Sequence, residues 1–259
     1  AYGDDRKTRR GAGCADRGTL TAASRYLFAV LLAILLPAMS PIFPALADSS
    51  SPILAAYYDR QMAVAGNVAY GWQGQDAPQR IHGDAVQVGV GRSTYYVLTA
   101  KGSLLKFPRA GAQAESLIDG VARFAAGRSG VLAILTSGAL WWLPEDGGKK
   151  RKIAEDVLAV AVGDGANYYV TTAGKLFVKG RAHRGQYGDG RLTETDRFVQ
   201  TAANVAQITA HTGHAILMTR GGDVLGTGGN IYGPVGRHGL GDKAVRGSKL
   251  AAGAKAIAT

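Results

Sequence analysis

Apolar residues occur along this chain in short runs that are separated by glycine-containing turns. The runs at 95–98, 131–135, 168–170 and 215–218 each lead to a dipeptide that ends in glycine, such as Lys-Gly or Ser-Gly, and then to another apolar segment. Two apolar runs around such a dipeptide are typical of a β-hairpin whose glycine occupies a turn position with positive φ. The pattern therefore predicts a series of β-hairpins.

The turn glycines recur at a nearly fixed interval. They are Gly66, Gly102, Gly138, Gly174 and Gly222, with steps of 36 residues up to Gly174 and a step of 48 residues after it. A further predicted strand begins, after closely similar steps, at Ala85, Val121, Val157, Val205 and Ala254. A period of this length indicates repeated supersecondary units that pack against their neighbours. We place the units near 49–84, 85–120, 121–156, 157–204 and 205–253, with 254–259 as the start of a further unit.

The strands of the predicted hairpins are apolar on both faces. Tyr96 and Leu98 point to one face, and Tyr95 and Val97 point to the other. A sheet with one solvated face would instead alternate apolar and polar residues. Small sheets packed face to face around an axis bury both faces, so the pattern predicts an all-β fold and, within that class, a β-propeller. A β-solenoid and a β-sandwich are the alternatives, but solenoid coils are usually shorter and sandwiches lack a fixed repeat.

Residues 1–47 have the three parts of a secretory signal peptide. An uninterrupted run of 11 apolar residues at 26–36 follows Arg9, Arg10, Arg17 and Arg25, and the small-residue site Ala45-Leu46-Ala47 follows the run. The run is too short for a membrane-spanning helix, which needs about 20 residues. We therefore expect cleavage after Ala47, a propeller domain at 48–259 and a mature protein outside the cytoplasm. An uncleaved membrane anchor is the alternative.

The composition agrees with a turn-rich β protein and narrows its chemistry. Glycine supplies 37 of the 259 residues, about twice its average usage. Cys14 is the one cysteine, and it lies in the predicted signal peptide, so an intramolecular disulfide framework and a multi-cysteine metal site are excluded. The net charge of +11 would fall to +8 after cleavage, because 24 basic and 16 acidic residues would remain. A basic protein attracts anionic partners, but export argues against nucleic acid as the ligand.

The C-terminal part of the chain carries a more specific motif. Gly-Gln-Tyr-Gly-Asp-Gly at 185–190 follows a glycine turn and strand at 174–180, and Gly-His-Ala-Ile-Leu at 213–217 follows the strand that begins at Val205. Over 157–259 this order resembles the repeat of the regulator of chromosome condensation superfamily. The shorter units of 49–156 are similar to bacterial secreted members of that superfamily, including a β-lactamase inhibitor protein built as a seven-bladed propeller.

The resemblance implies a bacterial protein that is periplasmic or secreted, and it implies a structural role for His214. It also implies seven blades, of which about five are visible. Natural proteins avoid exposed strand edges, so we expect this chain to be a partial or truncated propeller. Nucleotide exchange on a small GTPase, an activity known for a nuclear member, is not expected of an exported chain.

Few residues are candidates for site chemistry. His211 and His214 could supply two metal ligands, but zinc needs three or four, so a structural role is favoured. Neither a Ser/His/Asp order nor a paired-carboxylate spacing is present, so we predict no catalytic residue, no metal and no cofactor.

Two sets of residues are candidates for an interaction surface. The first is a basic run in the link between two blades: Lys149, Lys150, Arg151 and Lys152. The alternative is that this run is a solvated loop without a binding role. The second is the aromatic pair Trp72 and Trp142, although most aromatic residues on the strands are expected in the core.

The sequence thus predicts an exported, non-enzymatic binding module whose partner is another protein. One alternative is a propeller that binds or acts on polysaccharide. Another is an envelope-attached protein that binds an anionic polymer through the basic run, in which case salt would weaken the attachment.

Overall fold

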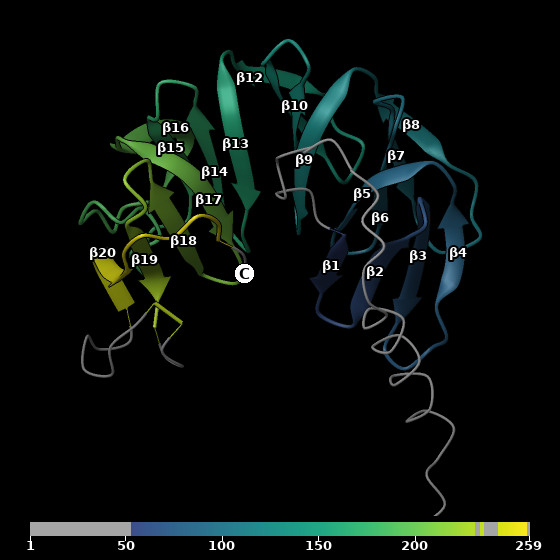
Figure 1. Ribbon diagram of the computed structural model, residues 1–259, viewed down its shortest axis with the longest axis horizontal. Helices are drawn as coiled ribbons and strands as arrows, with labels where there is room; N and C mark the ends of the chain where they lie inside the picture. Colours follow the sequence, from purple (N-terminus) through teal and green to yellow (C-terminus); the bar gives the residue numbers. More distant parts are fainter. Residues whose placement is uncertain (1–52, 231–233, 236–242, 258–259) are drawn as a thin grey trace, which may run out of the picture. The chain divides into compact units, whose positions relative to one another are not determined.

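The computed structural model describes residues 53–230, 234–235 and 243–257, and its regular secondary structure consists of β-strands. Within these residues, twenty strands form five four-stranded antiparallel sheets (Figure 1). Sheet 1 contains β1 (Leu54–Tyr57), β2 (Arg60–Ala65), β3 (Val68–Gln73) and β4 (Gln79–His82), and sheet 2 contains β5 (Ala85–Val90), β6 (Tyr95–Thr99), β7 (Leu104–Phe107) and β8 (Glu115–Ile118). Sheet 3 contains β9 (Val121–Gly127), β10 (Gly130–Leu135), β11 (Leu140–Pro144) and β12 (Arg151–Ala154). Sheet 4 contains β13 (Val157–Val162), β14 (Ala166–Thr171), β15 (Leu176–Gly180) and β16 (Thr195–Ala202), and sheet 5 contains β17 (Val205–Ala210), β18 (His214–Thr219), β19 (Val224–Gly229) and β20 (Lys243–Ala251).

The strands of each sheet are hydrogen-bonded in chain order, so that the first strand forms one edge and the fourth strand the other. In sheet 2, for example, Val97 of β6 lies opposite Val88 of β5 and Leu105 of β7. The first strands of sheets 2 to 5 begin at the predicted residues. The prediction of an all-β fold is confirmed.

The segment after β20 continues the repeat without being a strand. No strand is assigned over 254–257, the described part of the unit predicted to start at Ala254. The Ala254 N–H nevertheless donates to the Gly222 carbonyl at 3.0 Å, and the Ile257 N–H donates to Gln207 Oε1 at 3.1 Å. The same two kinds of contact are made at the start of β9.

The turns at the glycines fix where the following sheet begins: the carbonyl of the turn glycine accepts the first N–H of the next unit in four cases, and Asn67, next to Gly66, does so for Ala85. All five predicted turn glycines have positive φ, between 54° and 84°. At Gly102 the N–H donates to the Thr99 carbonyl at 2.9 Å, which closes the turn, and the Gly102 carbonyl accepts the N–H of Val121 at 2.9 Å. The turn therefore reverses the chain and also anchors the first residue of the next sheet.

A second periodic series precedes the first strands, and sequence reasoning misses it. The residues directly before the predicted strand starts all have positive φ, between 54° and 72°: Asp84, Gly120, Asp156, Asn204 and Gly253. Glycine, asparagine and aspartate are the residues that tolerate this conformation best. The signal was present in the sequence, because the series has the same steps as the strand starts.

Hydrophobic clusters fill the spaces between consecutive sheets. Neighbouring residues of one strand enter different clusters, because successive side chains of a strand point to opposite faces. Tyr95 and Val97 of β6 pack between sheets 1 and 2, whereas Tyr96 and Leu98 pack between sheets 2 and 3. The middle sheets are thus buried on both faces, as the apolar runs predicted, and this burial is the main source of stability.

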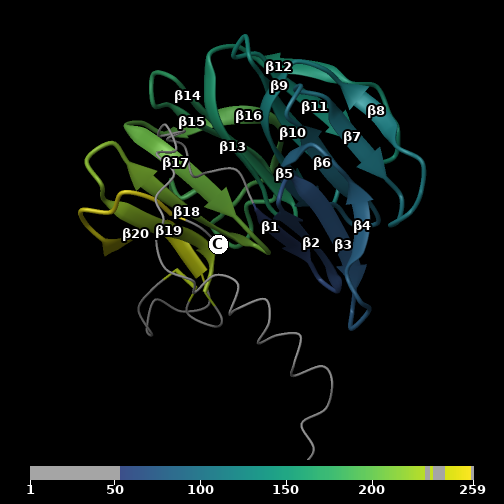
Figure 2. The ribbon, with the colours of Figure 1, turned by 45° about the vertical axis from the view of Figure 1, so that its right-hand side comes forward.

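The first strands of all five sheets line one pocket of about 640 Å³, here called the central pocket. Figure 2 shows that the sheets follow one another along an arc in chain order. Sheets that pack face to face in chain order, with their first strands around a common pocket, form a β-propeller. The predicted fold is therefore confirmed in preference to a solenoid or a sandwich.

The predicted signal peptide, residues 1–47, lies outside the residues that the structure describes, and export remains a prediction. Within the described ranges, the chain contains no helix that could span a membrane.

Candidate functional site

The two ends of the sheets carry different connections. One end, here called the loop face, has the links from first to second strand and from third to fourth strand, including 91–94, 128–129, 163–165, 211–213 and 145–150. The other end, the hairpin face, has the turn glycines and the links to the next sheet. Loops held on a rigid β scaffold are common positions for binding residues.

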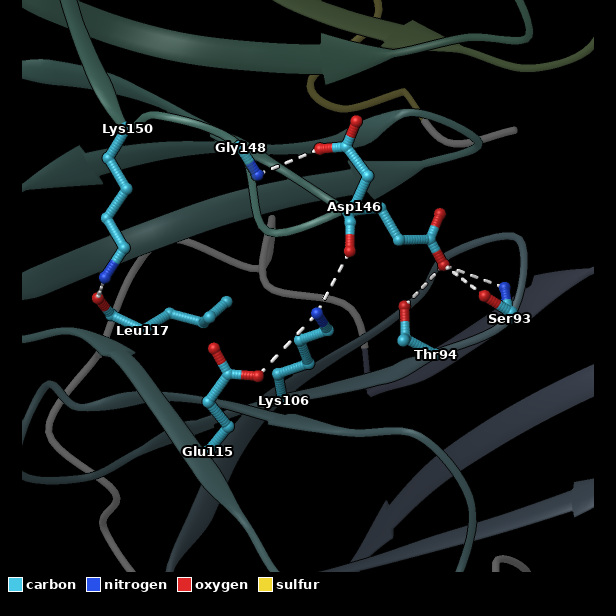
Figure 3. Close-up of polar contacts among 9 residues, drawn as sticks. Ser93, Thr94, Lys106, Glu115, Leu117, Asp146, Gly148 and Lys150 are labelled. Carbon is cyan, nitrogen blue, oxygen red and sulfur yellow. Dashed lines mark hydrogen bonds and ion pairs between the residues drawn. The ribbon is translucent and has the colours of Figure 1, made fainter.

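Glu145 joins sheets 2 and 3 at the loop face. It follows β11, and its partly buried carboxylate accepts the backbone N–H groups of Arg92 and Ser93 at 3.2 and 2.8 Å. The hydroxyl groups of Ser93 and Thr94 donate to the same carboxylate at 3.0 and 2.7 Å (Figure 3). A carboxylate with four donors is an anchor between sheets and is poorly suited to act as a free base.

Two lysines strengthen the same boundary between sheets (Figure 3). Lys106 of β7 donates to the Glu145 carbonyl at 3.0 Å, and its Nζ lies 3.7 Å from Oε2 of Glu115. Lys150 donates to the carbonyl of Leu117 in β8. One residue of the predicted basic run therefore contributes to packing between sheets.

The other residues of the basic run remain on the surface. Lys152 forms an ion pair with the exposed Glu155 three residues later. Lys149 and Arg151 are exposed, and the side chain of neither has a hydrogen bond or ion pair with another described residue. The run thus presents two unpaired cations to solvent, and its role as an interaction surface stays a prediction.

A cleft of about 460 Å³, here called the arginine cleft, lies on the loop face next to this boundary. Its walls include three exposed arginines from three sheets: Arg92, Arg128 and Arg181. Arg128 Nη1 lies 3.5 Å from Oδ1 of Asp164. The guanidinium groups of Arg92 and Arg181 have no hydrogen bond or ion pair among the described residues. Guanidinium groups bind carboxylates and phosphates in bidentate geometry, so the cleft can receive an anionic group.

The repeat explains part of this cleft. Gly-Arg-Ser occurs at 91–93 and again at 127–129, so Arg92 and Arg128 occupy equivalent loops of sheets 2 and 3. The equivalent residue of sheet 4 is Asp164, which places a carboxylate beside Arg128. Sequence reasoning misses these residues, although the repeated tripeptide is a signal for two of them. Arg181 follows β15, outside this repeat, and joins the cleft only through the packing of sheets.

The central pocket meets the arginine cleft at Asp164, which lines both. Apolar residues such as Val90 and Ala125 form much of the pocket wall. Gln87, only 1% exposed, uses its amide to accept the N–H of Phe124 at 3.2 Å and to donate to the Phe124 carbonyl at 2.6 Å. This buried amide therefore ties β5 to β9 and satisfies its own hydrogen bonds.

The structure does not bring the two candidate tryptophans together. Trp72 lies in sheet 1, is half-buried, and accepts the Tyr95 hydroxyl on its backbone carbonyl at 3.0 Å. Trp142 lies in sheet 3, is also half-buried, and packs against the cluster between sheets 3 and 4. Their role in binding stays a prediction.

The motif at 185–190, which carries the family resemblance, packs between sheets 4 and 5. Gln186 is buried, and its carbonyl accepts the Tyr168 hydroxyl at 3.2 Å. The Thr227 hydroxyl of β19 donates to the Gly185 carbonyl at 2.5 Å. The motif thus acts as a connection between sheets in this chain.

The histidine pair lies at the link between β17 and β18 of sheet 5. The ring centroids of His211 and His214 are 6.2 Å apart, and the His211 N–H donates to the His214 carbonyl at 3.1 Å. The described residues contain no group of three or more potential metal ligands. Burial lowers the pKa of the His214 imidazole below its ordinary value, and the neighbouring His211 acts in the same direction.

We expect the His214 imidazole to make stability depend on pH. Since its folded-state pKa is lowered, the unfolded chain binds the proton more readily, and stability is lost as the pH falls below about 6.5. A His214→Gln variant should lose less of its free energy of unfolding between pH 7.5 and pH 5 than the unsubstituted chain, as measured by urea unfolding. His183→Gln, which removes an exposed histidine, is the control. Equal pH profiles for His214→Gln and the unsubstituted chain would contradict this expectation.

The comparisons with known proteins agree with the geometry. No family model matches the sequence, and no curated protein matches it. Among solved structures, Prp20p from Saccharomyces cerevisiae aligns with a TM-score of 0.65 and 14% identity over 76% of this chain and 64% of that chain. Human WBSCR16 aligns with a TM-score of 0.65 and 14% identity over 78% of this chain and 67% of that chain.

A further structure of the yeast protein, RCC1 (Prp20) bound to Kap60, aligns with a TM-score of 0.62 and 12% identity over 76% of this chain and 63% of that chain. The chain therefore spans just under two thirds of the length of Prp20p in either structure. It has a β-propeller fold. This fold is similar to that of yeast RCC1 (Prp20), in agreement with the resemblance that the repeat motif indicated.

Proposed function

We propose that this protein is an exported, non-enzymatic β-propeller that binds another protein through its loop face. The observation that carries the proposal is the convergence of loops from sheets 2, 3 and 4 on the arginine cleft, beside the central pocket. A concave surface with apolar walls and a few convergent polar groups is typical of a binding site. Arginine is also enriched at protein interfaces.

The chemistry of the loop face favours binding over catalysis. Glu145 is occupied by four donors, and Asp164 by Arg128. A general base needs a carboxylate or imidazole that can reach the proton of a substrate, and these carboxylates are already used within the chain.

The structural neighbours that share this fold and bind proteins support a protein partner by analogy. Prp20p is described by its binding to Gsp1p and histones, and the yeast RCC1 structure contains Kap60. Export is supported by the signal-peptide pattern of 1–47, and Asp48 would then be the first mature residue.

Attachment to an anionic envelope polymer is a second candidate, because Lys149 and Arg151 present unpaired cations to solvent. Such binding would be weakened strongly by salt, since exposed charges are screened over about 8 Å at physiological ionic strength.

Site-directed photocrosslinking tests the proposed function. We expect the full chain with benzoylphenylalanine at Thr212, an exposed loop-face residue, to crosslink a protein from an envelope extract of the source organism. The same group at Lys101, an exposed residue of the hairpin face, is the matched control and should crosslink much less of that protein. A cytosolic extract should give no such product.

Three results would contradict the proposal. The first is the absence of a protein crosslink from Thr212, and the second is equal crosslinking from Lys101. The third is recovery of a polysaccharide that salt removes, which would support the anionic-polymer alternative.

A further inference from the structure

We infer that the arginine cleft binds a carboxylate side chain of the protein partner, while a neighbouring apolar side chain of that partner enters the central pocket. This inference rests on the proposed function, because it specifies the segment that the loop face recognises. The partner segment would contain an aspartate or glutamate next to an apolar residue.

Two guanidinium groups in the cleft are available to a ligand. The side chains of Arg92 and Arg181 are exposed, and their guanidinium groups have no hydrogen bond or ion pair among the described residues. Arg128 is paired with Asp164 across 3.5 Å, and since the Asp164 side chain is only 13% exposed, loss of this partner would leave a nearly buried carboxylate unpaired. The contacts with the ligand are therefore assigned to Arg92 and Arg181.

The acidic residues of the cleft are engaged within the chain. The Glu145 carboxylate accepts four hydrogen bonds from residues 92–94, and Oδ1 of Asp146 accepts the N–H of Gly148 at 3.0 Å. These acceptors need no donor from a ligand. Oδ1 of Asp164 has no hydrogen bond, but it lies 3.5 Å from Nη1 of Arg128. Most of the unfilled hydrogen-bonding capacity of the cleft is thus on the donor side, in the guanidinium groups of Arg92 and Arg181.

The same carboxylates favour a peptide over a dense polyanion. The walls include three acidic residues, Glu145, Asp146 and Asp164, so closely spaced sulfates or phosphates would meet repulsion as well as attraction. A single carboxylate flanked by uncharged residues can approach the arginines without that cost. This difference selects a protein segment from the anionic partners that the basic chain could attract.

The central pocket supplies the place for the apolar neighbour. Asp164 lines both hollows, so a segment bound at the arginines reaches the pocket directly. Val90 and Val162, at the loop-face ends of β5 and β13, belong to the pocket wall. Burial of an apolar side chain there adds hydrophobic stabilisation to the charged contact.

A random dodecapeptide display library, selected on the immobilised full chain, tests this inference. We expect enrichment of peptides in which an acidic residue adjoins an apolar one. For one such synthetic peptide, the Arg92→Gln/Arg181→Gln double variant should bind about tenfold more weakly, because two charge-assisted contacts are lost. Arg109→Gln, which removes an exposed loop-face arginine outside the cleft, is the control and should bind within about twofold of the unsubstituted chain.

Two further measurements make the test specific. A peptide with glutamine in place of its acidic residue should lose the dependence on Arg92 and Arg181. Heparin, used as the polyanion probe, should bind the double variant and the Arg109→Gln variant equally. All three substitutions affect exposed side chains, so the unfolding midpoints of both variants should equal that of the unsubstituted chain.

The inference is overturned if the selected peptides lack acidic residues, if Arg109→Gln weakens binding as much as the double variant, or if heparin alone depends on Arg92 and Arg181. It is also overturned if the double variant still crosslinks the envelope protein from Thr212 as well as the unsubstituted chain does, in which case the proposed function stands. Loss of the crosslink in the unsubstituted chain contradicts the proposed function itself, so the two failures are distinguishable.

Discussion

We expect Gly180→Ala to destabilise the protein by about 3 to 5 kcal/mol, because the added methyl group has no room. Gly180 is the last residue of β15 and has a φ of 108°. An ideal Cβ at this position would lie 2.1 Å from the backbone oxygen of Gly165 and 3.2 Å from the Cα of Ala166. Both contacts involve backbone of the paired strand and its loop, so relief requires the loss of strand pairing. Urea unfolding measures the effect.

Gly147→Ala is the matched control for this prediction. Gly147 also has positive φ, 79°, but no atom lies within 4 Å of its ideal Cβ. Its substitution should therefore cost about 1 to 2 kcal/mol, from backbone conformation alone. Equal losses for the two variants would show that the close approach to Gly165 has no energetic importance.

We expect Leu132→Ala to destabilise the protein by about 3 kcal/mol, because it leaves a cavity between sheets 3 and 4. Leu132 of β10 is fully buried and belongs to the same cluster as Tyr169 of β14. Trp142 packs against that cluster, so its fluorescence should report the unfolding transition in urea.

Val86→Ala is the control for the cavity. Val86 lies on β5 and is 44% exposed, so the loss of its two methyl groups should change the free energy of unfolding by less than about 0.5 kcal/mol. A loss below about 1 kcal/mol for Leu132→Ala would indicate that the two sheets do not pack tightly there.

Much of the fold could be predicted because turn residues and apolar strand patterns, which act locally, recur in each repeat. Positive φ at Gly102 is a requirement of the turn itself, and the strand that begins at Val121 follows at a constant distance. The alternation of Tyr95 and Tyr96 between two clusters follows from the period of a strand. Each of these features depends on residues that are close in sequence.

The candidate site could be predicted only in part. Arg92 and Arg128 repeat with the period of the sheets, and a search for recurring charged residues would find them. Glu145 reaches the 92–94 loop across 51 to 53 residues of sequence, and no local pattern indicates that contact. The basic run shows the reverse case. The sequence indicates no partner for Lys150 or Lys152, but in the structure Lys150 donates to Leu117 and Lys152 pairs with Glu155.

The amino-acid sequence by itself determined the class of secondary structure, the repeat, the strand starts and the two apolar faces of the middle strands. These features depend on turn conformation and on the two-residue period of a strand, both of which act between neighbours along the chain. Tertiary structure alone decided which charged side chains stay unpaired and where the surface forms a pocket or a cleft. Arg181 enters the cleft, and the Glu145 carboxylate binds the 92–94 loop, because adjacent sheets bring distant loops within hydrogen-bonding distance, a range over which sequence separation has no influence.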